Sequence, residues 1–282
     1  MENILEIKNL TKHYDGFTLD KVSLALPKGS IMGFIGSNGA GKTTTIKLIL
    51  NLIHRDGGDV KVFGLDNLKY EKQIKENLGV VFDESSFPIN MRVPHIDKVL
   101  SKIYKNWDAT VFSNYIHKFN LPVSKDIKDF SRGMKMKLSI AIALSHHAKL
   151  LILDEATSGL DPVVRDEILD VFLEFIQDEN NSIFVSSHII SDIEKVADYI
   201  TFINNGKIVF CESKDQLLNN YGILKCRHAE FERLDRTYVK GYRKNEFGVE
   251  ALVVKDKFRG SYTIDRASIE DIMLYTIKGE SR

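Results

Sequence analysis

Cysteine is scarce in this sequence. The 282-residue chain contains only two, Cys211 and Cys226. Their separation matches neither a C-x-x-C motif nor the spacing of metal ligands. The pattern therefore favours free thiols in a reducing cytosol over a disulfide framework or a cysteine metal site.

Long hydrophobic runs and a charge excess are also missing. No apolar run approaches the ~18 residues that a membrane-spanning helix needs, and no signal peptide is recognisable at the start. If the protein acts at a membrane, we expect another polypeptide to span it. Lys plus Arg and Asp plus Glu both number 39, so the net charge is zero. This balance argues against a dedicated nucleic-acid binder, although a local basic face remains possible.

The composition is that of an ordinary globular protein, with 43% hydrophobic and 28% charged residues. At ~150 residues per domain, the length suggests about two domains.

Residues 36–43, GSNGAGKT, match the phosphate-binding pattern G-x-x-x-x-G-K-[ST] at every fixed position. An apolar strand is predicted before this loop, at 31–35, and a helix after it, at 44–52. The glycines let backbone N–H groups converge on an anion, and the helix N-terminus adds positive potential. Lys42 is expected to reach the terminal phosphates, and the Thr43 hydroxyl to hold Mg²⁺.

Two later segments predict polar groups at the ends of buried strands. Residues 150–155 are four apolar residues followed by Asp154 and Glu155, which is typical of a parallel strand that carries acids at its carboxyl end. Asp154 suits the Mg²⁺ shell, and Glu155 suits a base for water attacking a γ-phosphate. The strand predicted at 181–188 ends in His188, which could donate a hydrogen bond to that phosphate.

Three other candidates for the functional site can also be explained by an ordinary structural role. Asp83 and Glu84 follow a predicted strand and could reach Mg²⁺ or water, or could simply enter a surface loop. Tyr14 lies in a turn, where stacking on a base and simple packing are equally plausible. Ser131 or Gly133 is expected near a helix N-terminus, a second anion site, although any N-cap serine would look similar.

The remaining segments predict the overall organisation. Two alternating runs, at 3–10 and 22–26, predict a small antiparallel sheet, with the first as a half-buried edge strand. Basic residues between 225 and 262 are interleaved with acids, which favours a solvated face over contact with lipid or nucleic acid. We further expect an inserted helical subdomain at about 86–145, an N-cap at Asp108, a hairpin around 204–207, strands at 223–226 and 249–254, and a last helix at 268–276.

In this order and spacing, the motifs resemble the ATP-binding subunits of ABC transporters over about residues 1–215. The resemblance implies an α/β fold: a RecA-like P-loop NTPase core with an N-terminal antiparallel β-subdomain and an inserted helical subdomain. Residues 1–215 would form the nucleotide-binding domain, and 216–282 a small accessory α+β extension. Nucleotide binding would involve Tyr14, stacked on adenine, and the loop residues Ser37, Asn38, Gly39, Ala40, Gly41, Lys42, Thr43 and Thr44.

The resemblance also implies roles for residues outside the loop. Glu155 and His188 would be catalytic, Asp161 would belong to the dimer-contacting D-loop, and Ser131 and Gly133 would contact the γ-phosphate bound by a partner subunit. Magnesium would be held by Thr43, Asp83 and Asp154.

Two positions depart from the family pattern. Residues 130–134, FSRGM, stand where the family usually has LSGGQ, so Arg132 and Met134 replace a glycine and a glutamine. Asp83 stands where the family generally has a glutamine that binds Mg²⁺ and senses the membrane subunit. A carboxylate can still coordinate Mg²⁺, but it adds negative charge beside a triphosphate.

The implied function is that of an ATP-hydrolysing subunit that uses ATP and Mg²⁺. It would pair with a second copy or a related subunit and drive export through separate transmembrane subunits. The signature and the short C-terminal region resemble the exporter-type branch, which includes antibiotic and bacteriocin export. Such a protein would be cytoplasmic and peripheral on the inner face of the cell membrane, with no nucleic-acid partner. The alternative is a soluble ABC-type regulatory ATPase or nucleotide switch with weak hydrolysis.

Overall fold

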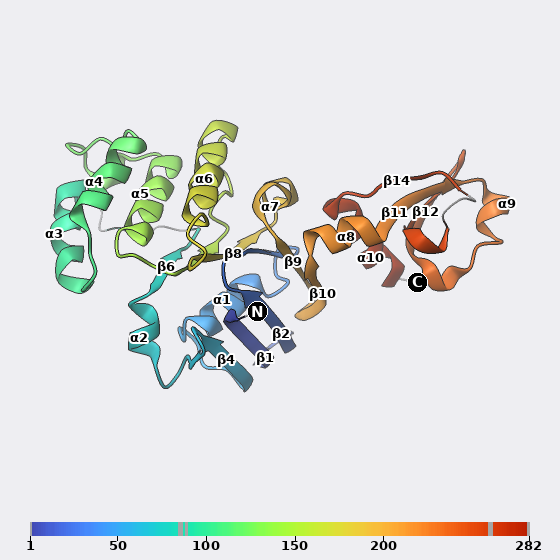
Figure 1. Ribbon diagram of the computed structural model, residues 1–282, viewed down its shortest axis with the longest axis horizontal. Coiled ribbons are helices and arrows are strands. Elements are labelled where there is room, and N and C mark those ends of the chain that lie inside the picture. The colour runs from blue at the N-terminus through green and yellow to red at the C-terminus, as the bar shows by residue number, and fades with distance from the viewer. Residues whose placement is uncertain (1, 84–86, 88–89, 259–261, 281–282) are drawn as a thin grey trace. The chain divides into compact units, whose positions relative to one another are not determined.

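The computed structural model describes residues 2–83, 87, 90–258 and 262–280 (Figure 1). Glu84, and residue 86 at the start of the expected helical range, lie outside the described residues. The chain forms two compact units, Met1–Cys211 and Glu212–Arg282.

The first unit begins with an antiparallel sheet in the strand order β2-β1-β4-β5. Strand β1 pairs with β2 on one side and β4 on the other, so the expectation of an edge strand at its start was wrong. Alternation in sequence reveals one buried face, but it carries no information about hydrogen-bonded neighbours. The strands are β1 (Asn3–Tyr14), β2 (Phe17–Pro27), β4 (Gly57–Val62) and β5 (Leu65–Asp66).

A six-stranded sheet in the order β10-β9-β3-β8-β7-β6 forms the centre of the first unit. The five strands from β9 to β6 pair in parallel, which places their carboxyl ends at one edge. Near-continuous apolar runs favour such strands because both sheet faces are covered. They are β3 (Ile31–Ile35), β6 (Leu78–Val81), β7 (Leu150–Asp154), β8 (Ser182–Ser187), β9 (Tyr199–Asn204) and β10 (Lys207–Ser213).

A tight turn joins β9 to β10, as predicted. Asn205 and Gly206 both have positive φ, 45° and 75°, which a two-residue hairpin turn of this kind requires. A Cβ at Gly206 would lie 1.9 Å from the Thr18 carbonyl oxygen, so a side chain could not be accommodated there.

The expected helical insertion consists of α3, α4 and α5, which lie side by side (Figure 1). The Asp108 side chain accepts hydrogen bonds from the Thr110 and Val111 N–H groups, which confirms the predicted N-cap. The indole N–H of Trp107 donates to Asp97 at 2.7 Å, a structural contact. The helices of the first unit are α1 (Lys42–Ile49), α2 (Glu71–Lys75), α3 (Val93–Ile103), α4 (Ala109–Lys118), η1 (Ile127–Asp129), α5 (Arg132–Leu144), α6 (Pro162–Phe175) and α7 (Ile190–Val196).

The second unit has an antiparallel sheet in the order β12-β13-β11-β14, and α10 contacts β12 and β13. Its core contains Phe231 and Leu224, both fully buried. The predicted strands at 223–226 and 249–254 and the last helix are confirmed, whereas the other elements were not predicted. The elements are α8 (Lys214–Asn220), β11 (Tyr221–Cys226), α9 (His228–Phe231), η2 (Arg236–Tyr238), β12 (Val239–Asn245), β13 (Gly248–Val254), η3 (Lys255–Lys257), β14 (Ile264–Arg266) and α10 (Ile269–Glu280).

Candidate phosphate-binding site

A cavity of about 620 Å³ opens at the carboxyl edge of the six-stranded sheet. Crevices at this edge are where open α/β sheets bind ligands. The chain segments that line it follow β3, β6, β7 and β8, together with the start of β2. The lining residues are Phe17, Asn38, Gly39, Gly41, Lys42, Thr43, Thr44, Asp83, Glu155, Ser158 and His188.

The glycines of the phosphate loop are required by its backbone. Gly39 and Gly41 have φ values of 80° and 113°, in the left-handed region that favours glycine. A Cβ at Gly36 would lie 2.5 Å from the Ile203 carbonyl oxygen. Helix α1 starts at Lys42, two residues earlier than expected, so its unpaired N-terminal N–H groups belong to the loop itself.

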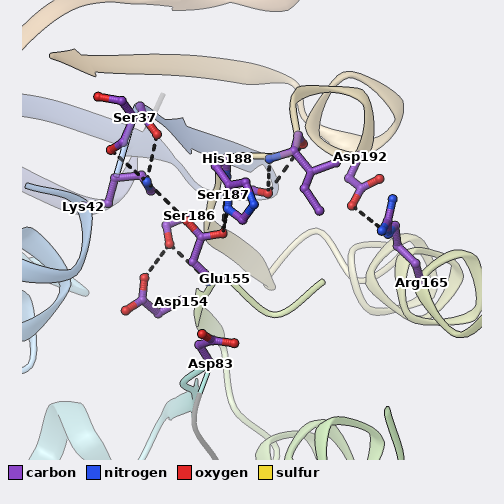
Figure 2. Close-up of polar contacts among 12 residues, drawn as sticks. Ser37, Lys42, Asp83, Asp154, Glu155, Arg165, Ser186, Ser187, His188 and Asp192 are labelled. Atoms are coloured by element: carbon purple, nitrogen blue, oxygen red, sulfur yellow. Dashed lines mark hydrogen bonds and ion pairs between the residues drawn. The ribbon is translucent and has the colours of Figure 1, made fainter. Parts of the chain in front are cut away.

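Lys42 is almost completely buried, with 6% of its surface exposed. Its Nζ donates to the carbonyl oxygens of Gly36 at 2.8 Å and Ser37 at 3.3 Å, and lies 3.2 Å from Glu155 Oε1 (Figure 2). Because a buried ammonium needs compensating charge, Glu155 supplies the counter-charge to Lys42.

Glu155 connects the phosphate loop to the end of β8. Its Oε2 lies 2.6 Å from His188 Nδ1, and Figure 2 shows the carboxylate between the Lys42 amine and the His188 ring. Since a carboxylate only accepts, we assign the proton of this contact to Nδ1. Glu155 also has a φ of 56°, a strained conformation for a residue with a side chain and one that clusters at functional sites.

Ser186 organises the acidic pair and was not predicted as a site residue. Its hydroxyl donates to Asp154 Oδ1 at 2.6 Å and accepts from the Glu155 N–H at 3.2 Å. Asp154 is buried, with 4% of its surface exposed, so this bond fixes a largely desolvated carboxylate. The sequence signal for Ser186 is its polar side chain directly after the apolar run at 183–185, although its partner Asp154 follows only from the pairing of β8 with β7.

Asp83 lines the cavity as expected, but its carboxylate is ion-paired with Arg132, the first residue of α5. Ser131 caps that helix by accepting from the Met134 N–H at 3.2 Å. Asp161 caps α6 in the same way. Ser131, Gly133 and Asp161 are not among the described residues that line the cavity.

Two aromatic rings flank the turn between β1 and β2. Tyr14 and Phe17 are cross-strand partners, and Phe17 lines the cavity. Tyr14 is 46% exposed, has Lys12 Nζ 5.6 Å from its ring centroid, and is not among the described lining residues. Phe17 was missed, although its position three residues after Tyr14 in a tight hairpin could have indicated it.

The oxygen donors at the cavity suit a hard divalent cation. Thr43 lies in the cavity wall, and the buried Asp154, the last residue of β7, precedes the cavity-lining Glu155. Magnesium typically takes one or two protein oxygens beside substrate phosphates, and this set fits that pattern. Over residues 2–83, 87, 90–258 and 262–280, no group of three or more His, Cys, Asp or Glu side chains could hold a metal alone.

The part of the chain that the structure describes contains no helix both long and apolar enough to cross a membrane.

Comparisons with known proteins agree on one family. The ABC transporter family model matches residues 19–158. The bacitracin transport ATP-binding protein BcrA of Bacillus licheniformis is 35% identical over 212 residues, which cover 74% of this chain and 69% of BcrA. The lantibiotic transport ATP-binding protein SrtF of Streptococcus pyogenes is 34% identical over 226 residues, 77% of this chain and 96% of SrtF.

A solved ATP-binding subunit of an ABC transporter has the same fold, with a TM-score of 0.69 and 24% identity. The match covers 76% of this chain and 91% of that one.

Proposed function

This chain belongs to the ATP-binding subunits of the ABC transporter family, and we propose that it powers export through separate transmembrane subunits. It binds ATP and hydrolyses it, as members of this family do. The similarity to bacitracin and lantibiotic transport proteins supports an antimicrobial peptide as the cargo. The cytoplasmic side of the cell membrane would be its place of action.

The observation that carries the proposal is the continuous contact from Lys42 through Glu155 to His188. Triphosphate bound in the loop competes with Glu155 for the Lys42 amine. Glu155, once released, is free to orient or deprotonate the attacking water. His188 then lies where it can donate a hydrogen bond to the γ-phosphate.

Magnesium would be held by Thr43 and Asp154, with Asp83 as a third candidate, and would neutralise charge on the β- and γ-phosphates. The hydrogen bond from Ser186 keeps Asp154 oriented for this task. The phosphates themselves would rest on the loop Ser37–Thr44, with its backbone N–H groups directed at them.

Pairing of two such subunits would complete the site. Ser131, Gly133 and Asp161 lie at or next to the N-termini of α5 and α6, outside the chain's own cavity. Helix N-termini bind anions, which supports contact of Ser131 and Gly133 with the γ-phosphate on a second copy or a related subunit. Residues 1–215 would perform these steps, and 216–282 would be an accessory region.

Replacement of the proposed base tests the assignment. We expect Glu155→Gln to bind ATP, to lose turnover by about 10²-fold or more, and to accumulate ATP-bound dimers, because the amide cannot accept the water's proton. Turnover is measured by phosphate release and dimers by sedimentation. Glu174→Gln, at an exposed ion pair with Lys118, is the control and should hydrolyse ATP normally. Normal turnover in Glu155→Gln would refute the catalytic role.

A further inference from the structure

The first residue of α5 is attached to the cavity wall through its side chain. The Arg132 guanidinium forms an ion pair with Asp83, which follows the edge strand β6 and lines the cavity. Both side chains are about half exposed, at 50% and 41%. An ion pair this exposed contributes little to folding stability, so its removal should leave the fold intact.

Arg132 also lies against a third segment, the loop between β7 and α6. A Cβ at Gly159 would be 2.9 Å from Arg132 Nη1 and 3.0 Å from its Cζ, so a side chain there would displace the guanidinium. Gly159 also has a φ of 65°, which favours glycine. The Arg132 side chain therefore bridges the end of β6, the start of α5 and the loop that leads to Asp161.

The residues on either side of Arg132 are the proposed contacts to a partner's nucleotide. Ser131 caps α5, and a Cβ at Gly133 would lie 3.2 Å from Val164 at the start of α6. The start of α5 is thus packed on α6, while the Arg132 side chain links it to Asp83 in the chain's own cavity.

We propose that Asp83 and Arg132 act as one positioning unit that couples the chain's own nucleotide cavity to the surface it offers a second copy of this chain. The inference rests on the proposed function. Arg132 neutralises the Asp83 carboxylate beside the phosphates, and Asp83 in return holds the start of α5 in place. Arg132 is a positioning residue, since it is not among the described residues that line the cavity.

A double-mutant cycle in the Glu155→Gln background tests the pairing. We expect Asp83→Asn and Arg132→Gln each to weaken ATP-dependent dimerisation about five- to tenfold, as contacting residues that act together do. Dimerisation of the neutral double variant should be no weaker than that of either single variant, because each of the three proteins lacks the same ion pair. The reversed pair, Asp83→Arg with Arg132→Asp, should regain dimerisation to within about threefold of the parent protein, since the attraction is restored.

Two measurements separate positioning from a general structural defect. Dimerisation is measured by sedimentation with ATP, and the Kd for ATP is measured on dilute, monomeric protein. We expect Arg132→Gln to weaken ATP binding by no more than about threefold, less than its effect on dimerisation, because the uncompensated Asp83 charge is 41% exposed and is screened by water and salt. Arg92→Gln is the matched control, since it breaks a comparable exposed pair, with Arg92 Nε 2.8 Å from Asp126, and should dimerise normally.

Normal dimerisation in both single variants would overturn the inference. It would also be overturned if the neutral double variant lost dimerisation by the product of the two single losses and the reversed pair did not regain it. Absence of ATP binding, or of ATP-dependent dimers in Glu155→Gln alone, would instead refute the proposed function and this inference with it.

Discussion

The two sheets of the molecule arrange their polar residues in opposite ways. In the first unit, parallel strands bring their carboxyl ends to one edge, so Glu155 and His188 line a single cavity, and the buried Asp154 lies next to Glu155 at the end of β7. In the second unit, antiparallel strands end alternately at both edges. A parallel sheet thus concentrates the residues that follow its strands, whereas an antiparallel sheet disperses them.

Several charged residues of the second unit form local pairs on its surface. Lys225 lies 2.9 Å from Asp265, and a hydrogen bond to that carboxylate raises the pKa of the lysine. A hydrogen bond from Lys244 lowers the pKa of Glu232. Local pairing of this kind is typical of a solvated structural surface, which supports the accessory role proposed for 216–282.

The largest effect is expected from a core residue of the second unit. Phe231 is fully buried, and its ring centroid lies 4.6 Å from that of Tyr242. The Arg236 guanidinium lies 3.7 Å from the Phe231 ring centroid. Phe231→Ala should destabilise the second unit by about 3–5 kcal/mol through lost burial and the cavity left behind. ATP hydrolysis should persist, because the cavity and its lining belong to the first unit.

Trp107, the only tryptophan, reports selectively on the first unit. Its fluorescence transition should keep its midpoint in Phe231→Ala, while calorimetry records a lower-temperature transition for the second unit. Phe184→Ala, in the core of the first unit, is the matched control and should shift the fluorescence transition. Equal shifts in both variants would mean that the two units unfold together.

A smaller effect is expected at the aromatic pair of the β1–β2 turn. Phe17→Ala and Tyr14→Ala should each weaken ATP binding about two- to tenfold, which is the range of an aromatic stacking contact. Inorganic tripolyphosphate, which has no base, should bind both variants as it binds the parent. Calorimetric titration of both ligands distinguishes base stacking from damage to the phosphate loop.

The control for this pair is Tyr70→Ala, which removes another half-exposed tyrosine of the same unit. If only Phe17→Ala weakens ATP binding, the adenine rests on the cavity-lining ring and Tyr14 is a surface residue. If neither variant does, base stacking on this turn is refuted.

The features of the first unit that could be predicted are those coded by neighbouring residues. The phosphate loop, the acids after 150–153 and the hairpin at 204–207 depend on local backbone geometry or on apolar runs, which a single segment displays. The second unit was predicted less completely, because strands such as β12 and β14 are short or interleaved with charges. Their pairing partners, not their own periodicity, make them strands.

Contacts between distant segments could not be predicted in the same way. Ser186 reaches Asp154, and Arg132 reaches Asp83, only because strand order and helix packing bring those segments together. The prediction that the start of β1 is an edge strand was wrong for the same reason. The strand that covers this edge, β4, comes from residues 57–62, far along the chain. Sequence patterns therefore predict which residues carry the chemistry, and the topology determines which other side chains contact them.

The smallest effect expected is a pH dependence of the stability of the first unit. His146 is 1% exposed, stacks on Tyr104 with ring centroids 4.1 Å apart, and lies 2.9 Å from the Leu78 carbonyl oxygen through Nε2. Burial lowers the pKa of His146 below its ordinary value, although its contacts with backbone carbonyls oppose this. The unfolded chain therefore binds a proton more readily than the folded one near pH 6.

The contribution of His146 to stability should be complete above about pH 6.5, the ordinary histidine pKa, and should decline as the pH falls toward its lowered folded value. One proton can change the unfolding free energy by at most about 1.4 kcal/mol per pH unit. Gln at this position can still donate to the Leu78 carbonyl. In His146→Gln, the midpoint of the Trp107 fluorescence transition should therefore fall less between pH 7 and 5.5 than in the parent protein. The second unit, whose only histidine is the exposed His228, should respond less over the same range. An unchanged slope in His146→Gln would show that other groups govern the acid sensitivity of the first unit.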